Sequence, residues 1–523
     1  MLFLIVGLVL MAAFKLWLVR GDRIVARPLP ADDLDYLKAA SHWYWGAKYG
    51  VLAFVRLPGY PLFVSISKAS RLPLRFTTEL IQLAGAAAAA LAFYFSGVRR
   101  GLCLMLYGAL IFHPATFAQN SFATPDPFFK AITFFAVGAM VMQLSTRRLV
   151  FAALSGLAIG VLWNTREEAI LMAGYLAGFF AILLWSWRGA WREVAWHAMV
   201  TCAVIAVICI ACDTANYKKY GNFAKSDFAS HDFQAALKAM LRIKPVTPPP
   251  RFAAIPAQTR DLAYAASPAL RELQPLLDGT APSGWKEAGE PLGIVNDYAL
   301  GYLLWALRDA AAQAGKYDSP QITRAYYREI ADQINGAISR GELPHRFVFS
   351  TFTDPDLSEY VRYLPASLGR ICGTFAAAEP PIAPPWSVSG EPVSPRQAEL
   401  FQRMTNETET VSREGDPVTR AIRGVLARFY GPAVACLTVV AAVALGYLLC
   451  VDRARFVRSP AFAVLALLLM MVAGRVVILG LIDVSSWNAN SPRYLLPIMG
   501  LYSCALGILI DEAVATIASR PRP

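Results

Sequence analysis

Three carboxylates crowd into the stretch Ala31-Asp32-Asp33-Leu34-Asp35-Tyr36-Leu37-Lys38-Ala39-Ala40, which follows an apolar N-terminal segment. Only 37 of the 523 residues are acidic, so this concentration beside a membrane-spanning pattern is unusual. Carboxylates at a membrane surface can bind a divalent cation or act as a general base. Acidic residues in a first helical turn also complement the helix dipole, so Asp32 or Asp33 could instead cap a helix over 34–45. Both roles stay open, and we expect Asp35 to be a solvated residue of that helix.

The composition of the chain is that of a membrane protein. Hydrophobic residues make up 56% and charged residues 16% of the sequence, whereas soluble domains average about 25% charged residues. The apolar residues are concentrated in long runs, which predicts an all-α polytopic membrane protein with one polar insertion. The net charge of +12 fits Lys and Arg residues that flank membrane-spanning helices. The long apolar runs lead us to expect membrane lipids among its partners. The sequence has no nucleic-acid-binding motif, so we expect no nucleic acid among them.

Apolar runs that approach the length of a membrane-spanning helix, about 20 residues, recur along the chain. The first run has no positive n-region and no clear cleavage site, so we interpret it as a retained helix and not a signal peptide. The sequence therefore predicts about ten transmembrane helices. The runs are 1–18, 78–97, 101–119, 127–144, 149–164, 169–187, 194–212, 431–451, 460–482 and 494–514.

Arginine clusters fall on every second connection between these runs, and short arginine-rich loops stay in the cytoplasm. This pattern places both termini in the cytoplasm of a protein integral to the inner (plasma) membrane, although Arg20, Arg23 and Arg27 then lie outside. The predicted organisation has three parts. Residues 1–212 form a membrane region of about seven helices, with a first outer loop over 20–77. Residues 213–430 form a mostly helical extracytoplasmic domain inserted between helices 7 and 8, and residues 431–523 form a membrane region of about three helices.

The insertion contains two clear helix signals. Apolar residues recur at helical spacing over 295–306, and Gly315 suits the end of that helix. Ser319 followed by Pro320 predicts an N-cap and the first residue of the next helix.

In this topology the outer side collects several polar residues. Asp126 lies between Pro125 and Pro127, which stiffen the turn and would place its carboxylate opposite Asp32; its alternative role is again a helix cap. Arg166, Glu167 and Glu168 sit between two apolar runs. Ionisable groups at membrane depth usually line a cavity, whereas the same groups in an interfacial loop have no special role.

Arginines near the outer ends of the last two helices allow a similar choice. Arg475 lies inside an apolar run, about two turns from its outer end, and Arg493-Tyr494 begins the last run. Each guanidinium could extend outward to the interface. Each could also bind a phosphate, for which arginine has matching donors.

Four short motifs resemble those of the GT-C-fold membrane glycosyltransferases, a superfamily that includes the protein O-mannosyltransferases and the aminoarabinose lipid A transferases. The resemblance lies in the order of the motifs along the chain and in their common location on the outer side of the membrane. The large insertion between helices 7 and 8 departs from members whose soluble domain follows the last helix. The four motifs are Asp32-Asp33-Leu34-Asp35-Tyr36, Arg56-Leu57-Pro58-Gly59-Tyr60-Pro61, Asp126 and Arg493-Tyr494-Leu495-Leu496-Pro497.

The resemblance implies transfer of a sugar from a polyprenyl-phosphate-linked donor to a lipid, glycan or protein acceptor of the cell envelope, on the outer face of the membrane. Asp32 would be the base that deprotonates or positions the acceptor hydroxyl, and Asp126 the second catalytic carboxylate. A divalent metal ion, if one takes part, would bind to these two acids. The residues expected to bind the substrate or its phosphate, some from these motifs and some from their own placement in the sequence, are Asp33, Arg56, Tyr60, Arg166, Glu167, Arg475, Arg493 and Tyr494.

Two other classes of function remain as alternatives. A transporter would place its binding site near the bilayer midplane between repeated halves, but the sequence shows no internal repeat and its polar residues cluster outside. A non-catalytic assembly or scaffold protein would use the large outer domain to bind a partner. In that case Asp32 and Asp126 would only cap helices.

Overall fold

The computed structural model describes residues 1–25, 32–168, 172–279, 284–351, 353–376, 394–407 and 416–519. These residues form helices joined by turns, with no strand among them and one isolated bridge between Ile243 and His345. The predicted all-α class is therefore confirmed. The prolines between 380 and 385, which predict a linker, lie outside the described residues.

Where they are described, the ten predicted apolar runs lie largely on helices, and six helices of the described residues are long and apolar enough to cross a membrane. The third run is interrupted at His113, where the short helix α6 (Pro114–Gln119) begins. The six long helices are α4 (Leu74–Phe95), α7 (Pro125–Thr146), α10 (Trp191–Tyr220), α20 (Pro417–Val451), α22 (Pro460–Ser485) and α23 (Pro492–Ala518). The shorter apolar helices are α1 (Leu2–Leu18), α5 (Arg100–Ile111), α8 (Leu149–Trp163) and α9 (Met172–Ser186).

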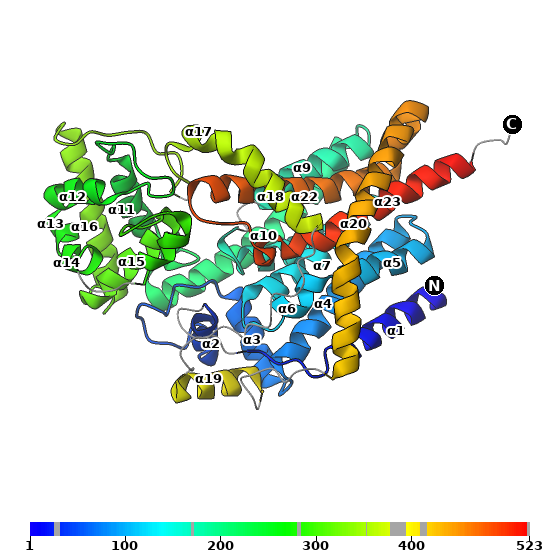
Figure 1. Cartoon of the computed structure of the whole chain (residues 1–523), viewed down its shortest axis with the longest axis horizontal. Coiled ribbons are helices and arrows are strands. Elements are labelled where there is room, and N and C mark those ends of the chain that lie inside the picture. The colour runs from blue at the N-terminus through cyan, green and yellow to red at the C-terminus, as the bar shows by residue number, and fades with distance from the viewer. Residues whose placement is uncertain are drawn as a thin grey trace.

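The apolar helices form one bundle, and most of the polar insertion lies beyond one end of it (Figure 1). Both ends of the chain lie at the opposite end of the bundle (Figure 1). Within the bundle, α4 and α7 pack closely through glycines: a Cβ atom on Gly138 would lie 3.1 Å from the carbonyl oxygen of Ala88. Small residues allow such close approach between membrane helices. This packing fixes the start of α7, which carries Asp126.

Two short helices form the outer segment that follows α1. They are α2 (Asp33–Ser41) and α3 (Gly59–Ala69). The helix predicted over 34–45 ends earlier, because Trp43 and Tyr44 take positive φ angles of 50° and 63°. Side chains of α2, α3 and the later helix α19 (Pro395–Thr405) share one small apolar core, which holds this segment against the bundle.

The compact part of the insertion is helical and has its own apolar core between residues 228 and 348, joined by Val55 of the outer segment. Ser319 caps α16 as predicted: its Oγ accepts a hydrogen bond from the backbone N of Ile322 at 3.3 Å. The helices of this part are α11 (His231–Arg242), α12 (Ala257–Ala266), α13 (Pro268–Arg271), α14 (Gln274–Leu277), α15 (Leu300–Gln313) and α16 (Pro320–Ser339).

The helix predicted over 295–306 begins only at Leu300. Before that point the backbone bonds to other elements: the N of Leu300 donates to the carbonyl oxygen of Phe252 at 2.8 Å. Asp297 Oδ1 also accepts a hydrogen bond from the N of Tyr298 at 2.8 Å. These bonds replace the first helical turn that the spacing predicted. Gly315 follows the helix with a φ of 72°, as expected for a C-terminal glycine.

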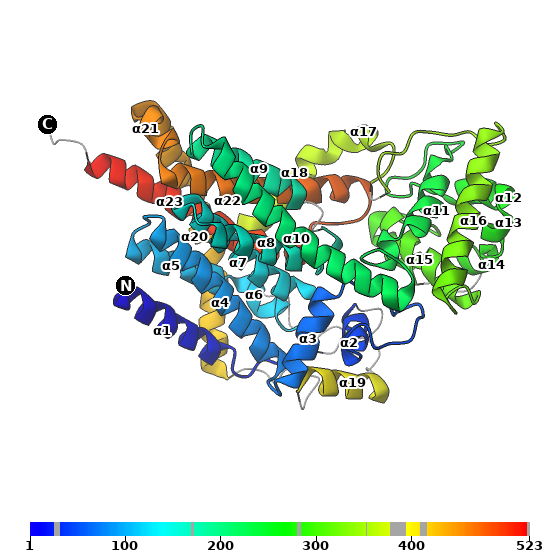
Figure 2. The same ribbon diagram turned by 180° about the vertical axis from the view of Figure 1, so that it is seen from behind.

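The rest of the insertion returns to the bundle. Helices α10 and α20 continue without a break across the predicted boundaries at 212 and 430. Helix α18 (Leu364–Ala376) packs against α22, and α19 (Pro395–Thr405) packs against α2 and α3 (Figure 2). The two remaining short helices are α17 (Leu357–Tyr360) and α21 (Arg453–Val457).

Candidate functional site

Asp32 occupies the N-cap position of α2, but its side chain makes no capping hydrogen bond. Its Oδ1 atom accepts a hydrogen bond from Arg56 Nη2 at 2.6 Å. Its Oδ2 atom accepts one from Arg493 Nη2 at 3.0 Å. The Asp32 side chain is 34% exposed. Of the two roles that the sequence left open, the geometry therefore favours a carboxylate directed at other side chains.

Asp126 lies in the first turn of α7 and is almost completely buried. Its Oδ2 atom accepts a hydrogen bond from Arg493 Nε at 2.6 Å, and Arg166 Nη1 pairs with its Oδ1 atom. Arg493, at the start of α23, thus joins the two acids that were expected to face each other. The guanidinium bridges them through Nε on one side and Nη2 on the other.

The contacts continue in both directions from these three residues. On one side Arg56 Nη2 also bonds to Asp35 Oδ2 at 3.1 Å. On the other side Glu168 pairs with both Arg166 and Arg475. We refer to the whole set as the ion-pair row. Its members, in order of contact, are Asp35, Arg56, Asp32, Arg493, Asp126, Arg166, Glu168 and Arg475.

The ion-pair row alternates four carboxylates with four guanidinium groups. Transferring ions out of water is costly, and only close pairing with satisfied hydrogen bonds offsets that cost. Burial raises the pKa of Asp32, but Arg56 and Arg493 lower it by more and hold it below its ordinary value. Glu168 is similar: burial raises its pKa, and Arg166 and Arg475 more than offset this increase. Both carboxylates are therefore ionised at neutral pH.

Two members of the row differ from their sequence expectations. Asp35 was expected to be solvated, yet it bonds to Arg56 and its side chain is only 19% exposed. Glu168 was not among the predicted site residues, whereas Glu167 was. The structure leaves Glu167 exposed and, among the described residues, outside any ion pair. Nothing in the sequence distinguished these two neighbours.

The other predicted binding residues lie around the row. Tyr494 places its ring under Arg166, with 5.4 Å between the guanidinium carbon and the ring centroid. Its carbonyl oxygen accepts hydrogen bonds from Arg475 Nε and Nη2 at 3.0 and 2.9 Å. Arg475 is therefore turned inward and does not extend to the interface. Tyr60 and Asp33 are both buried. The pKa of Tyr60 is raised, mainly because the side chain is buried and secondly because the Asp33 carboxylate lies nearby.

The insertion contributes an aromatic residue that sequence reasoning missed. The guanidinium carbon of Arg56 lies 4.5 Å from the ring centroid of Trp305 on α15 and 5.0 Å from that of Tyr36. The Arg56 backbone is also held, because its carbonyl oxygen accepts a hydrogen bond from Tyr44 Oη at 2.7 Å. Cation–π contacts of this kind stabilise a partly desolvated guanidinium. The insertion is thus in direct contact with the ion-pair row.

Gly59 explains part of the Arg56-to-Pro61 motif. The N of Gly59 donates to the carbonyl oxygen of Asn164 at 2.7 Å, and a Cβ atom at position 59 would lie 2.7 Å from that same oxygen. The turn that contacts Gly59 carries Arg166 and Glu168. The glycine therefore permits the start of α3 to approach this turn.

Gly59→Ala is expected to destabilise the protein by about 1–3 kcal/mol, because the added methyl group meets backbone that must move. The displaced turn is expected to disturb Arg166 as well. Thermal unfolding of the purified protein in detergent measures the effect. Gly50→Ala is the matched control, since a Cβ atom there would meet no atom within 4 Å. Equal melting temperatures for the two variants would contradict this account of Gly59.

The surroundings of Asp32 and Asp126 do not fit a site in which these two carboxylates bind a divalent metal ion. Guanidinium groups already contact both oxygens of each carboxylate, and Arg493 lies between the two acids. Within the described part of the chain, no group of three or more His, Cys, Asp or Glu residues has metal-binding geometry. A cation would have to displace several arginines.

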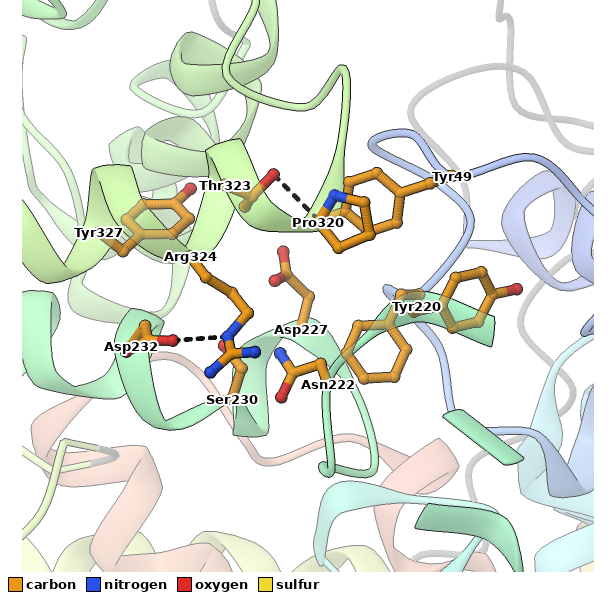
Figure 3. Close-up of a pocket in the computed structure, with 11 residues that line it drawn as sticks. Tyr49, Tyr220, Asn222, Asp227, Ser230, Asp232, Pro320, Thr323, Arg324 and Tyr327 are labelled. Atoms are coloured by element: carbon orange, nitrogen blue, oxygen red, sulfur yellow. Dashed lines mark hydrogen bonds and ion pairs between the residues drawn. The ribbon is translucent and has the colours of Figure 1, made fainter. Parts of the chain in front are cut away.

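A small pocket lies at the joint between the insertion and the outer segment (Figure 3). Its charged groups are already paired: Asp232 Oδ2 accepts from Arg324 Nε at 2.9 Å (Figure 3). Across the pocket, Tyr49 Oη donates to Thr323 Oγ1 at 3.0 Å. We interpret this pocket as part of the joint that fixes the insertion next to Arg56.

Comparisons with known proteins give only distant similarities. No protein-family model matches the chain, and no curated protein matches it significantly. Among solved structures, ArnT from Cupriavidus metallidurans bound to undecaprenyl phosphate shares 14% identity, with a TM-score of 0.35, over 99% of this chain and 78% of ArnT. The apo form of ArnT gives 14% identity and a TM-score of 0.34, over 98% and 78% of the two chains. Scores this low do not establish a shared fold or a family for this chain.

Proposed function

We propose that this chain is a membrane glycosyltransferase that moves a sugar from a polyprenyl-phosphate-linked donor to an acceptor of the cell envelope. The observation that carries the proposal is the contact of Asp32 and Asp126 with one guanidinium, that of Arg493. The three residues come from distant parts of the chain, and each was singled out by its sequence motif. A structural cap would need no such convergence.

In the proposed step the oxygen of an acceptor hydroxyl attacks the anomeric carbon of the donor sugar. The bond between that carbon and the phosphate oxygen breaks, and its electron pair leaves with the lipid phosphate. The hydroxyl proton passes to Asp32, the more exposed of the two acids. Because its pKa is held low, Asp32 is a weak base that orients the hydroxyl first and accepts the proton late.

Arg493 has the matching role at the departing phosphate. Its side chain is 21% exposed, so a donor phosphate can approach it, whereas Asp126 on its other side is buried. A fixed cation beside a developing phosphate charge commonly contributes several kcal/mol, on the order of 3–4, to catalysis. Asp126 and Arg166 act as positioning residues for that cation. The proposed step uses no metal ion.

The proposal places the site on the outer face of the inner membrane, with both termini in the cytoplasm. The arginine-rich loops of the sequence support this sidedness. Helix ends support it too, because α2, the start of α7 and the start of α23 meet at the end of the bundle that lies opposite the termini (Figures 1 and 2).

The test is a strain that lacks this protein and is complemented with wild type or with Asp32→Asn. We expect wild type to restore an envelope glycolipid or glycan that Asp32→Asn does not restore, as measured by mass spectrometry of envelope extracts. Asp332→Asn, on an exposed position of α16, is the control and should behave as wild type. If Asp32→Asn reaches normal membrane levels and restores the same product, the glycosyltransferase proposal fails.

A further inference from the structure

Two lysines inside the bundle have no carboxylate partner among the described residues. Lys15 on α1 and Lys130 on α7 are each 1% exposed. The Nζ atom of Lys15 has no hydrogen-bond partner in the described part of the chain. Lys130 Nζ donates to Thr116 Oγ1 at 2.7 Å, a neutral acceptor. Neither lysine belongs to the ion-pair row.

The two ammonium groups converge on α6, together with a third cation. Lys15 Nζ lies 3.3 Å from the ring centroid of Phe117, which adjoins Thr116 in sequence. The guanidinium carbon of Arg423, from α20, lies 5.2 Å from the same ring. Three cations from three different helices therefore surround two successive residues of α6.

The acids that face this region are already bound to arginines. Asp22 accepts from Arg75 Nη2 and from Arg423 Nη2, both at 2.9 Å. Glu79 pairs with Arg75 and accepts from Asn120 Nδ2 at 2.9 Å. Neither lysine forms an ion pair with these acids, although Glu79 attracts both of them electrostatically. Two carboxylates therefore face four cations, Lys15, Lys130, Arg75 and Arg423, whereas the ion-pair row has one carboxylate for each guanidinium.

A buried ammonium group without an anionic partner is strongly unfavourable. The contact with the Phe117 ring offsets part of that cost for Lys15. Lys130 has the Thr116 hydroxyl and, with 5.5 Å between Nζ and the ring centroid, the ring of Phe134. An anion held between the three cations would remove the remaining cost. Ionisable groups at such a depth in a membrane bundle generally mark a binding site or an ion pathway.

We propose that Lys15, Lys130 and Arg423 bind the phosphate headgroup of a membrane lipid. The surroundings favour a lipid over a free anion. The C-terminal end of α1 lies next to the start of α20 (Figures 1 and 2). The outer face of α1 is apolar, with Leu2 and Leu10 exposed at 76% and 64%. In the proposed complex a lipid chain lies along this face, and the helices around the buried lysines separate enough for its phosphate to reach them. Such a site differs from the place where sugar transfer is proposed, although Lys130 lies one turn from Asp126 on α7.

The test is binding of radiolabelled dodecyl phosphate to the purified full-length protein in a non-ionic detergent. Lys15→Met and Lys130→Met are each expected to weaken binding about 30-fold or more, because each removes one partner of a buried charge pair. Lys219→Met, at an exposed position of α10, should bind as wild type. In the absence of ligand, melting temperatures of both test variants should equal or exceed that of wild type, since methionine removes an unpaired buried charge. Binding by both variants at wild-type affinity would overturn the proposal.

Competition identifies the source of the phosphate. Displacement of dodecyl phosphate by phosphatidylglycerol would assign the site to a bilayer phospholipid, and failure to displace it would assign the site to a lipid phosphate monoester. Inorganic phosphate that competes as tightly as dodecyl phosphate would overturn the lipid assignment. These measurements need no sugar transfer, so they stand apart from the proposed enzymatic activity and can succeed if that activity is absent.

Discussion

Arg493→Lys is expected to lower the rate of sugar transfer by about 10²–10³-fold, although it keeps the positive charge. The guanidinium bonds to Asp126 through Nε and to Asp32 through Nη2. A lysine ammonium is a compact point charge and cannot span the two carboxylates in this fixed geometry. The developing charge on the lipid phosphate would then be met by a cation in the wrong place.

The measurement is the initial rate of product formation in membranes that contain equal amounts of each variant. The matched control is Arg340→Lys, because Arg340 is 61% exposed on the insertion and pairs with Glu342. A full rate for Arg493→Lys would show that positive charge alone is sufficient. The bridging role of Arg493 would then be wrong.

Asp126→Asn is expected to destabilise the folded protein by about 3–5 kcal/mol. Asp126 is 1% exposed and faces Arg166 on one side and Arg493 on the other. The neutral amide would leave two guanidinium groups without their shared counter-ion. Asn is almost the same size as Asp, so the decrease in the free energy of unfolding is caused by the missing charge and not by a cavity.

Thermal unfolding in detergent measures this loss, with Asp332→Asn as the control of equal chemistry at an exposed position. Asp32→Asn gives a second comparison. Its side chain is 34% exposed, so a smaller loss of stability is expected there. Melting temperatures for Asp126→Asn that equal those of the control would contradict the ion-pair row as a source of stability.

Much of the candidate site could be predicted because charge is rare in an apolar chain. Asp32, Asp126, Arg166 and Arg493 stood out as polar residues next to apolar runs, and the structure brings all four into one row. Their placement at one end of the bundle follows from topology. Alternating helix directions return every second connection to the same side.

Other members could not be predicted, for reasons of local geometry. Glu167 and Glu168 are adjacent in a turn, and only the direction of each side chain decides which one meets Arg475. Asp35 lies one turn after Asp32 on a short helix, and its burial depends on Arg56 from another segment. Trp305 lies in the insertion, far along the chain, among many aromatic residues. No pattern in the sequence relates it to Arg56.

Helix ends were predicted less well than helix cores. The run over 101–119 contains His113, which caps α6 through its ring and interrupts the apolar helix. In the opposite sense, α10 and α20 extend beyond their apolar runs, because a helix continues wherever its backbone bonds are satisfied and not only where lipid surrounds it. Hydropathy reports the surroundings of a helix and does not mark its last residue.

The contact between Trp305 and Arg56 makes the insertion a part of the site and not an accessory to it. One face of the Arg56 guanidinium is formed by a residue about 250 positions away in the sequence. Exchange of residues 228–348 for an unrelated domain would therefore remove the ring that covers Arg56 while leaving all eight residues of the ion-pair row in place.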